Sequence, residues 1–194
     1  TAHASKFIQK GIYDDAQIYG RTDWAFKQLR GLRAGIVRIT IDWSTVAKRR
    51  PQKPADPADK AYNWTAVDHV ISKAAANKVR VLATIYGTPR WAGPARNRLP
   101  RRMTDLRLFS HAAARRYSGT YRVETAENEP VRRLPAVRHW LAWNEPNNPV
   151  FLKPQWKRFR GGWRAQSAFD YAKICSAVWA GVHSTRLAGE KVAC

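Results

Sequence analysis

The residues with the clearest chemical meaning lie together between positions 140 and 148, in the segment WLAWNEPNN. An apolar run ends abruptly at Asn144 and Glu145, so a strand here delivers an amide and a carboxylate to its own carboxyl end. Parallel α/β proteins carry their chemistry at that end of the strands. Trp143, Pro146 and the neighbouring amide are surroundings that can raise the pKa of the Glu145 carboxyl toward that of a general acid. The alternative is a polar strand end with a structural role only.

The elements that must position these residues follow from the hydrophobic pattern. Alternating or β-branched runs predict strands, and residues at helical spacing follow each of them. The predicted strands cover residues 7–13, 36–43, 79–86 and 137–143, and a fifth begins near residue 191. Helices are predicted to begin at caps Thr22, Asn63 and Thr104, and a last helix has its inner face between 171 and 182. The third strand is almost entirely apolar, which predicts cover on both faces.

Four strand–helix units followed by another strand predict a parallel α/β architecture. A complete (β/α)₈ TIM barrel has eight strands in typically about 250 residues. The chain has 194 residues. We therefore expect a single domain, residues 1–194, that forms a partial barrel of about four βα units plus the start of strand five.

Charge is the most unusual feature of the composition. The chain contains 35 Lys and Arg against 14 Asp and Glu, a formal net charge of +21. Such a field attracts polyanions. Basic residues within 96–116 and 153–164 are expected to converge at one rim, because both segments follow the carboxyl ends of strands. An arginine-rich composition without a binding role remains the alternative, since the excess is spread along the chain.

The two cysteines have no metal-ligand spacing, and neither a metal nor another cofactor is expected. Cys175 falls on the inner face of the last helix, where a core packing role is expected, and Cys194 sits at a strand that can fray. No structural disulfide between them is therefore predicted. No apolar run approaches the roughly 18 residues of a membrane span, so a soluble chain is expected. Residues 2–4 have the small-x-small pattern of a signal-peptidase site, which favours secretion.

With these residues assembled, the chain resembles the amino-terminal half of a clan A glycoside hydrolase, nearest to families 39 and 5. The similarity covers residues 11–194 and is carried by the segments LRGLRAGIVRITIDWSTV, YNWTAVDHVISKAAANKVRVLATIYGTPRWAG and WNEPN. Of these three segments, WNEPN is the most specific to the family. The resemblance implies that Glu145 is the catalytic acid/base and that Asn144 binds the sugar 2-hydroxyl. It also implies that Arg38, on the second strand, steadies the nucleophile.

The resemblance further implies aromatic sugar platforms at strand ends, a role that Trp43, Tyr86 and Trp91 are placed to fill. Retaining hydrolysis needs two carboxyl groups about 5 to 5.5 Å apart, one to protonate the leaving oxygen and one to attack the anomeric carbon. Family members carry the nucleophilic glutamate on strand seven. The other glutamates of this chain lie at positions 124, 127, 129 and 190, and none is a credible nucleophile.

The sequence therefore predicts a retaining O-glycoside hydrolase whose acid/base half is present here, with a carbohydrate substrate. On its own, the chain is expected to be inactive. A non-catalytic protein that binds acidic polysaccharide or nucleic acid is the alternative, because basic and aromatic residues alternate in the segment FLKPQWKRFRGGWR, predicted to be an irregular loop. A purely structural fragment is a third reading.

Overall fold

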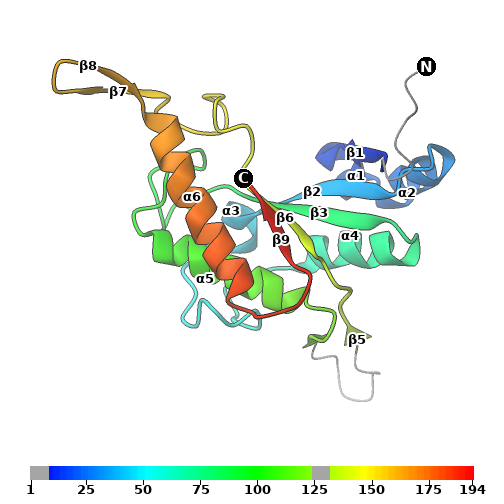
Figure 1. The fold of residues 1–194 in the computed structure, drawn as a ribbon. Helices are drawn as coiled ribbons and strands as arrows, with labels where there is room; N and C mark the ends of the chain where they lie inside the picture. Colours follow the sequence, from blue (N-terminus) through cyan, green and yellow to red (C-terminus); the bar gives the residue numbers. More distant parts are fainter. Residues whose placement is uncertain (1–8, 124–131) are drawn as a thin grey trace, which may run out of the picture.

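The structure, a computed structural model, describes residues 9–123 and 132–194. Its centre is a five-stranded sheet in the order β1-β2-β3-β6-β9, and every neighbouring pair is parallel. The strands are β1 (Gly11–Tyr13), β2 (Ile36–Asp42), β3 (Arg80–Tyr86), β6 (His139–Ala142) and β9 (Lys191–Ala193). Strands that follow one another along the chain are neighbours in the sheet (Figure 1). The predicted parallel α/β architecture is confirmed.

Helices connect the strands. They are α1 (Asp15–Gly20), α2 (Thr22–Gly31), α3 (Trp43–Val46), α4 (Thr65–Ala76), α5 (Met103–Arg116) and α6 (Gln166–His183). The short helices α1 and α3 follow directly after β1 and β2 and were not predicted. The Asn63 side chain accepts a hydrogen bond from the Thr65 N–H at 3.1 Å, as a cap of α4 should. Thr104 does not cap α5, because that helix already begins at Met103.

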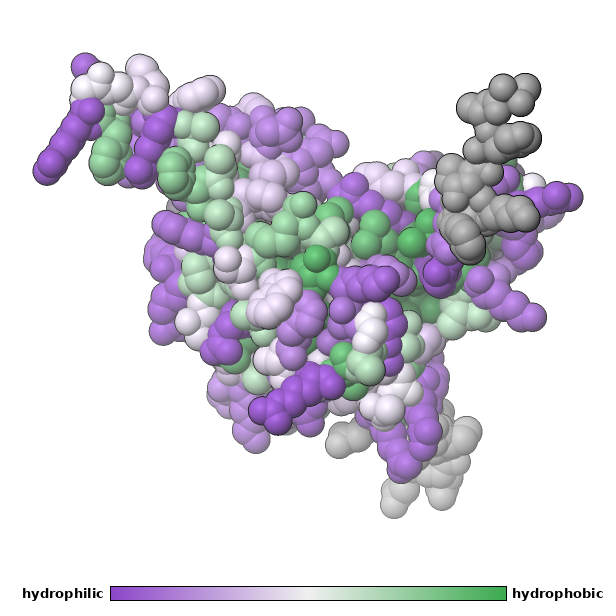
Figure 2. Space-filling model, in the orientation of Figure 1, coloured by the Kyte–Doolittle hydropathy of each residue, from purple (hydrophilic) through white to green (hydrophobic). Residues whose placement is uncertain are grey.

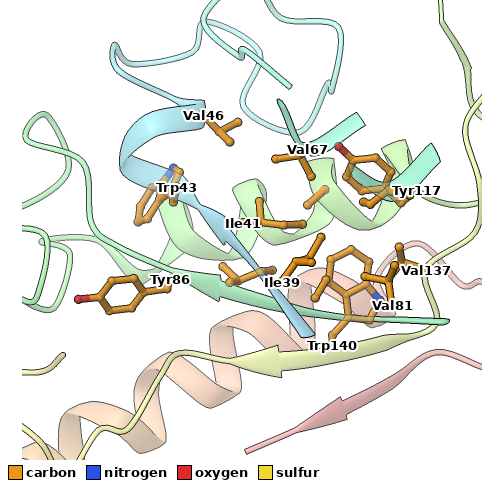
Figure 3. Packing of buried hydrophobic residues seen from close by; sticks show 14 of the residues in the cluster. Ile39, Ile41, Trp43, Val46, Val67, Val81, Tyr86, Tyr117, Val137 and Trp140 are labelled. Carbon is orange, nitrogen blue, oxygen red and sulfur yellow. The ribbon is translucent and has the colours of Figure 1, made fainter. Parts of the chain in front are cut away.

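One face of the sheet is covered by helices. Val37, Ile39 and Ile41 of β2 point to this face and are fully buried, because side chains alternate along a strand. Figure 1 shows α4 below β3, with α5 and α6 to the left of the sheet. In the close view of Figure 3, Ile39 and Ile41 lie between the strands and the helices, beside Val67 of α4. The hydrophobic core therefore lies between this face and the helix layer.

The opposite face of the sheet is open. Arg38, Thr40, Leu82 and Leu141 point to it and are each only partly buried. Figure 2 shows hydrophobic side chains at the surface in the middle of the molecule. The prediction that the third strand is covered on both faces is confirmed for its carboxyl half, where Ala83 to Tyr86 are all buried, but not for its amino half, where Arg80 is exposed and Leu82 is only partly buried.

Two antiparallel strand pairs lie outside the five-stranded sheet. Strands β4 (Arg122–Val123) and β5 (Arg132–Arg133) form one of them. Glu124, Glu127 and Glu129 lie outside the described residues, as do residues 1–8, which include the start of the first predicted strand. The second is a hairpin of β7 (Trp156–Phe159) and β8 (Gly162–Ala165). This hairpin corrects the prediction of an irregular loop, because the two-residue Arg160–Gly161 turn, with Gly161 at φ 80°, lets two β-favouring aromatic segments pair.

The prediction about the cysteines is also wrong. Cys175 and Cys194 form a disulfide with their Cα atoms 5.8 Å apart. The reason lies in the alternation of the last strand: Val192 and Cys194 share the helix-covered side, where α6 runs along β9. Pairing of β9 with β6 holds this end of the chain in place next to the helix. Within the described ranges, no helix is long and apolar enough to cross a membrane.

Candidate active site

The turn after β6 carries the two residues with the strongest functional prediction, Asn144 and Glu145. The residue before them, Trp143, is buried, and its indole N–H donates to the Phe151 carbonyl at 2.7 Å. The backbone is left-handed at Trp143 (φ 68°) and at Glu145 (φ 33°), a conformation that side-chain-bearing residues rarely adopt. The buried indole holds this strained turn, so the orientation of Asn144 and Glu145 depends on the core.

Arg38 connects the turn to the open face of the sheet. Its Nη2 donates to Asn144 Oδ1, and its Nε donates to Thr84 Oγ1 at 2.9 Å. The guanidinium also lies over the Tyr13 ring, 4.5 Å from the centroid. Arg38 therefore joins β1, β2, β3 and the end of β6 in one polar cluster. The structure brings Arg38 and Asn144 into direct contact, which was not predicted from the sequence.

This contact also orients the Asn144 amide. A guanidinium has donors only, so the atom that faces Arg38 must be the amide oxygen. The amide NH₂ then lies on the other side of the group, where it can donate to a ligand hydroxyl. Asn144 is 6% exposed, so it is held in place while keeping a narrow contact with solvent.

Glu145 is exposed at the rim. The Asn148 side chain donates to Glu145 Oε2 at 3.3 Å, and the Asn148 N–H donates to the Glu145 carbonyl at 2.9 Å. The apolar enclosure expected around this carboxyl is not formed by Trp143, because that indole points into the core. Asn148 was not predicted as a site residue. Its position three residues after Glu145, at the end of a turn, is the available sequence signal.

An ion pair between two further side chains lies at the carboxyl end of β2. Arg96 Nη2 and Asp42 Oδ2 form an ion pair at 2.7 Å, and Ser44 also donates to the Asp42 carboxylate. Gly87 has φ +88°, and a Cβ there would lie 2.5 Å from Asp42 Oδ1, so the close approach of these strand ends requires glycine. Asp42 and Arg96 were missed from the sequence, since only the pairing of β2 with β3 brings them together.

Trp43 is not a sugar platform in this structure, which corrects its predicted role. The side chain is fully buried, its ring stacks on Phe109 at a centroid distance of 5.5 Å, and the edge of Trp91 packs against it. The strand end turns directly into α3, which rotates Trp43 into the helix-covered core. Figure 3 shows the Trp43 side chain on α3.

Tyr86 and Trp91 lie nearer the surface, but a cation already covers each ring. The Arg96 guanidinium is 4.6 Å from the Tyr86 centroid, and the Arg50 guanidinium is 4.6 Å from the Trp91 centroid. Tyr86 is 3% exposed, and burial raises the pKa of its hydroxyl. Only Trp91 is partly exposed, so it is the better candidate for a sugar contact.

Two surface features surround this cluster. The loops after β3 and β6 meet where Arg98 forms a parallel bridge to Lys153, so the two basic segments contact each other at the rim as predicted. A hollow of about 820 Å³ lies beside Asp42 and Arg96, between α1 and α4, and Glu145 does not line it. Glu145 lies at the exposed rim, outside this hollow.

No protein-family model and no curated protein sequence matches the chain. Its fold is similar to that of a family 39 glycoside hydrolase from Xanthomonas axonopodis pv. citri, with TM-score 0.59 and 16% identity over 95% of this chain and 34% of that one. It is also similar to a glucosidase from Croceicoccus marinus, with TM-score 0.56 and 18% identity over 87% of this chain and 32% of that one.

A family 1 β-glucosidase from Thermotoga maritima gives TM-score 0.55 and 14% identity, covering 91% of this chain and 38% of that one. The chain therefore spans about a third of the length of these structures. At this identity the similarity concerns the fold alone. The fold is that of glycosidases, and the resemblance recognised in the sequence is confirmed at that level.

Proposed function

We propose that this chain is the acid/base part of a retaining O-glycoside hydrolase built on a (β/α)₈ barrel. The observation that carries the proposal is the contact between Arg38 on β2 and Asn144 at the end of β6, directly before Glu145. The fold similarity to glycosidases supports it. The glucosidases among the similar structures favour a β-linked glucoside or a related glycan as substrate.

In this proposal Glu145 acts twice. As an acid, it gives its proton to the glycosidic oxygen while the bond to the anomeric carbon breaks and a nucleophilic carboxylate attacks that carbon. As a carboxylate, it then takes a proton from the water that releases the sugar. Asn148 holds the Glu145 carboxyl at the rim, and the outward NH₂ of Asn144 donates to the 2-hydroxyl of the sugar.

The nucleophile is assigned to a strand outside this chain. The described ranges contain one other glutamate, Glu190. It directly precedes β9, so it lies at the amino ends of the strands, whereas Glu145 lies at their carboxyl ends. Further strands would also cover the open face of the sheet. The 194 residues alone are therefore proposed to be catalytically silent. Secretion remains part of the proposal, and the Cys175–Cys194 disulfide supports it, because such bonds persist in oxidising compartments.

The proposal is tested with aryl β-glycosides and the Glu145→Gln variant of a protein that extends past Cys194 through a second glutamate-bearing strand end. The variant should lose far more activity on substrates with poor leaving groups than on activated ones, because only the former depend on protonation. A loss of about 10²–10⁴-fold is the usual contribution of a general acid. Glu190→Gln makes the same chemical change at the other end of the sheet and should leave hydrolysis intact.

Three results would contradict the proposal. Wild-type rates for Glu145→Gln on natural glycans would remove Glu145 as the acid. Hydrolysis by the 194 residues alone would show that the nucleophile is already present. A coding sequence that continues past Cys194 without a second strand-end glutamate would leave no retaining mechanism.

A further inference from the structure

The hairpin β7–β8 carries large aromatic side chains that the fold does not use. It projects from the amino end of α6, away from the body of the molecule (Figure 1). The Trp156 side chain is 61% exposed and that of Trp163 is 70% exposed. Large apolar side chains gathered on one projecting element mark an interaction site more often than chance exposure does.

The strand register divides the hairpin into two faces. Arg158 pairs directly with Trp163, and Trp156 lies two residues before Arg158 on the same strand. Because directly opposed residues and residues two apart share a face, these three side chains form one surface, here called the indole face. Lys157 and Arg164 pair on the other face.

On that other face, Arg164 has contact partners within the hairpin and on α6. The Arg164 guanidinium lies 4.0 Å from the Phe159 ring centroid and 5.0 Å from that of Phe169. It also donates two hydrogen bonds to Gln166 Oε1, at 3.1 and 3.0 Å. These contacts fix the hairpin on the first turns of α6. The three side chains of the indole face, by contrast, make no hydrogen bond, ion pair or ring contact within residues 9–123 and 132–194.

The base of the hairpin is fixed to the Glu145 turn. The Gln155 side chain donates to the Pro146 carbonyl at 3.0 Å and to the Leu152 carbonyl at 2.6 Å. The Ser167 N–H of α6 donates to the Gln155 carbonyl at 3.2 Å. The hairpin thus belongs to the same connection as the candidate acid and is held in a defined position relative to it.

The charge of this segment indicates what it binds. Residues 151–169 contain five Lys and Arg and no Asp or Glu. In Figure 2 the hairpin shows strongly hydrophilic side chains beside paler ones. We propose that the indole face is an outlying subsite for an acidic glycan, a chain that bears carboxylate or sulfate groups. The two indoles stack on sugar rings, and Arg158 between them pairs with the anionic group.

The geometry fits a chain rather than a single sugar. Diagonal neighbours across two paired strands lie about 7–8 Å apart, so Trp156 and Trp163 present two separate contact areas with Arg158 beside both. The choice of a glycan over a nucleic acid rests on the proposed function, because the hairpin is fixed to the turn that carries Glu145. Substrates would extend from the Glu145 rim along the hairpin.

The test is a binding measurement by isothermal titration calorimetry. The probes are polygalacturonate, a neutral xylan and single-stranded DNA. Arg158→Gln should weaken polygalacturonate binding by about tenfold, the loss of one charge-assisted contact, and should leave xylan binding nearly unchanged. Lys157→Gln removes the same charge from the adjacent residue on the other face and should have little effect.

The indoles are tested with a double variant that carries both Trp156→Ala and Trp163→Ala. This variant should bind both glycans more weakly than the unchanged protein. Trp179→Ala on α6 is the matched control, since that side chain is 53% exposed but lies away from the hairpin. Circular dichroism checks that each variant is folded, and single Trp→Phe variants replace any that is not.

The outcomes separate the possibilities. Equal effects of Arg158→Gln and Lys157→Gln would show diffuse charge attraction and overturn the subsite, as would tighter binding of DNA than of polygalacturonate. Loss of self-association in the Trp variants, measured by sedimentation without glycan, would make the face a contact between copies and also overturn it. Binding is measured without turnover, so the two proposals fail separately. Unchanged hydrolysis of aryl β-glycosides by Glu145→Gln in the extended protein would contradict only the glycosidase proposal, and hydrolysis of those glycosides without polygalacturonate binding would contradict only the subsite.

Discussion

The two faces of the parallel sheet differ sharply in what their side chains do. On the helix-covered face, Val37, Ile39, Trp140 and Ala142 are buried and serve the core. On the open face, Arg38 and His139 sit among partly exposed residues of the same strands. Neighbouring positions in one strand thus have opposite roles. The comparison shows that the covered face stabilises the fold, while the open face can keep polar groups available for chemistry.

The contrast also explains how a charged side chain is tolerated inside a strand. Arg38 lies between the buried Val37 and Ile39, yet its guanidinium has partners in Thr84, Asn144 and Tyr13. Thr84 is fully buried on the open face because Arg38 covers it. A buried polar group costs stability unless it is paired, and each member of this cluster is paired.

The largest expected effect tests the covered face. Trp140→Ala should lower the free energy of unfolding by about 3–5 kcal/mol, because it removes a fully buried indole and leaves a cavity. Leu82→Ala, on the open face, should cost clearly less, since that side chain already contacts solvent. Urea denaturation of both variants measures the difference. Equal losses would mean that the open face is covered in solution.

The disulfide sharpens the comparison at the edge of the sheet, because it joins α6 to the end of β9 on the covered side. Its cysteines are 19 residues apart, and closing a loop of that size stabilises a protein by about 3 kcal/mol. Reduction should therefore lower the midpoint of urea unfolding. A variant with Cys175→Ser and Cys194→Ser should unfold at that lower midpoint and be insensitive to reductant. An unchanged midpoint on reduction would show that β9 is held in place without the bond.

The smallest expected effect concerns His139, on the open face, and the pH dependence of the free energy of unfolding. Partial burial lowers the pKa of His139, and the charges of Arg80 and Lys191 lower it further. The folded protein then binds the proton less readily than the unfolded chain does. The contribution of His139 to stability is present above its ordinary pKa of about 6.5 and is lost as the pH falls below it.

His139→Gln should flatten the fall in unfolding free energy between about pH 7 and pH 5, a window set by the ordinary pKa and the region below it. The effect is small because the ring is partly solvated. His69→Gln, which makes the same substitution on α4, is the matched control variant. An unchanged slope in the His139 variant would mean that the open face does not impose this penalty.

Local patterns in the sequence were enough to predict the parallel α/β architecture and the place of Asn144 and Glu145. Periods of two and 3.6 residues are set by neighbours along the chain, so strands and helices can be read without knowing their partners. The apolar run that ends at Asn144 likewise places that amide and the next carboxylate at a strand end. The contact between Arg38 and Asn144 was not predicted, because it depends on the pairing of β2, β3 and β6.

Other features were decided only by the tertiary structure. Trp43 follows a strand end as a sugar platform would, but helix α3 turns it into the core. Cys194 meets Cys175 because the pairing of β9 with β6 sets which way its side chain points. Asp42 and Arg96 joined the site because the pairing of β2 with β3 brings the two strand ends together. A sequence pattern shows that successive side chains of a strand point to opposite faces. Only packing between distant segments decides which of the two faces is covered, and therefore which residues remain available for function.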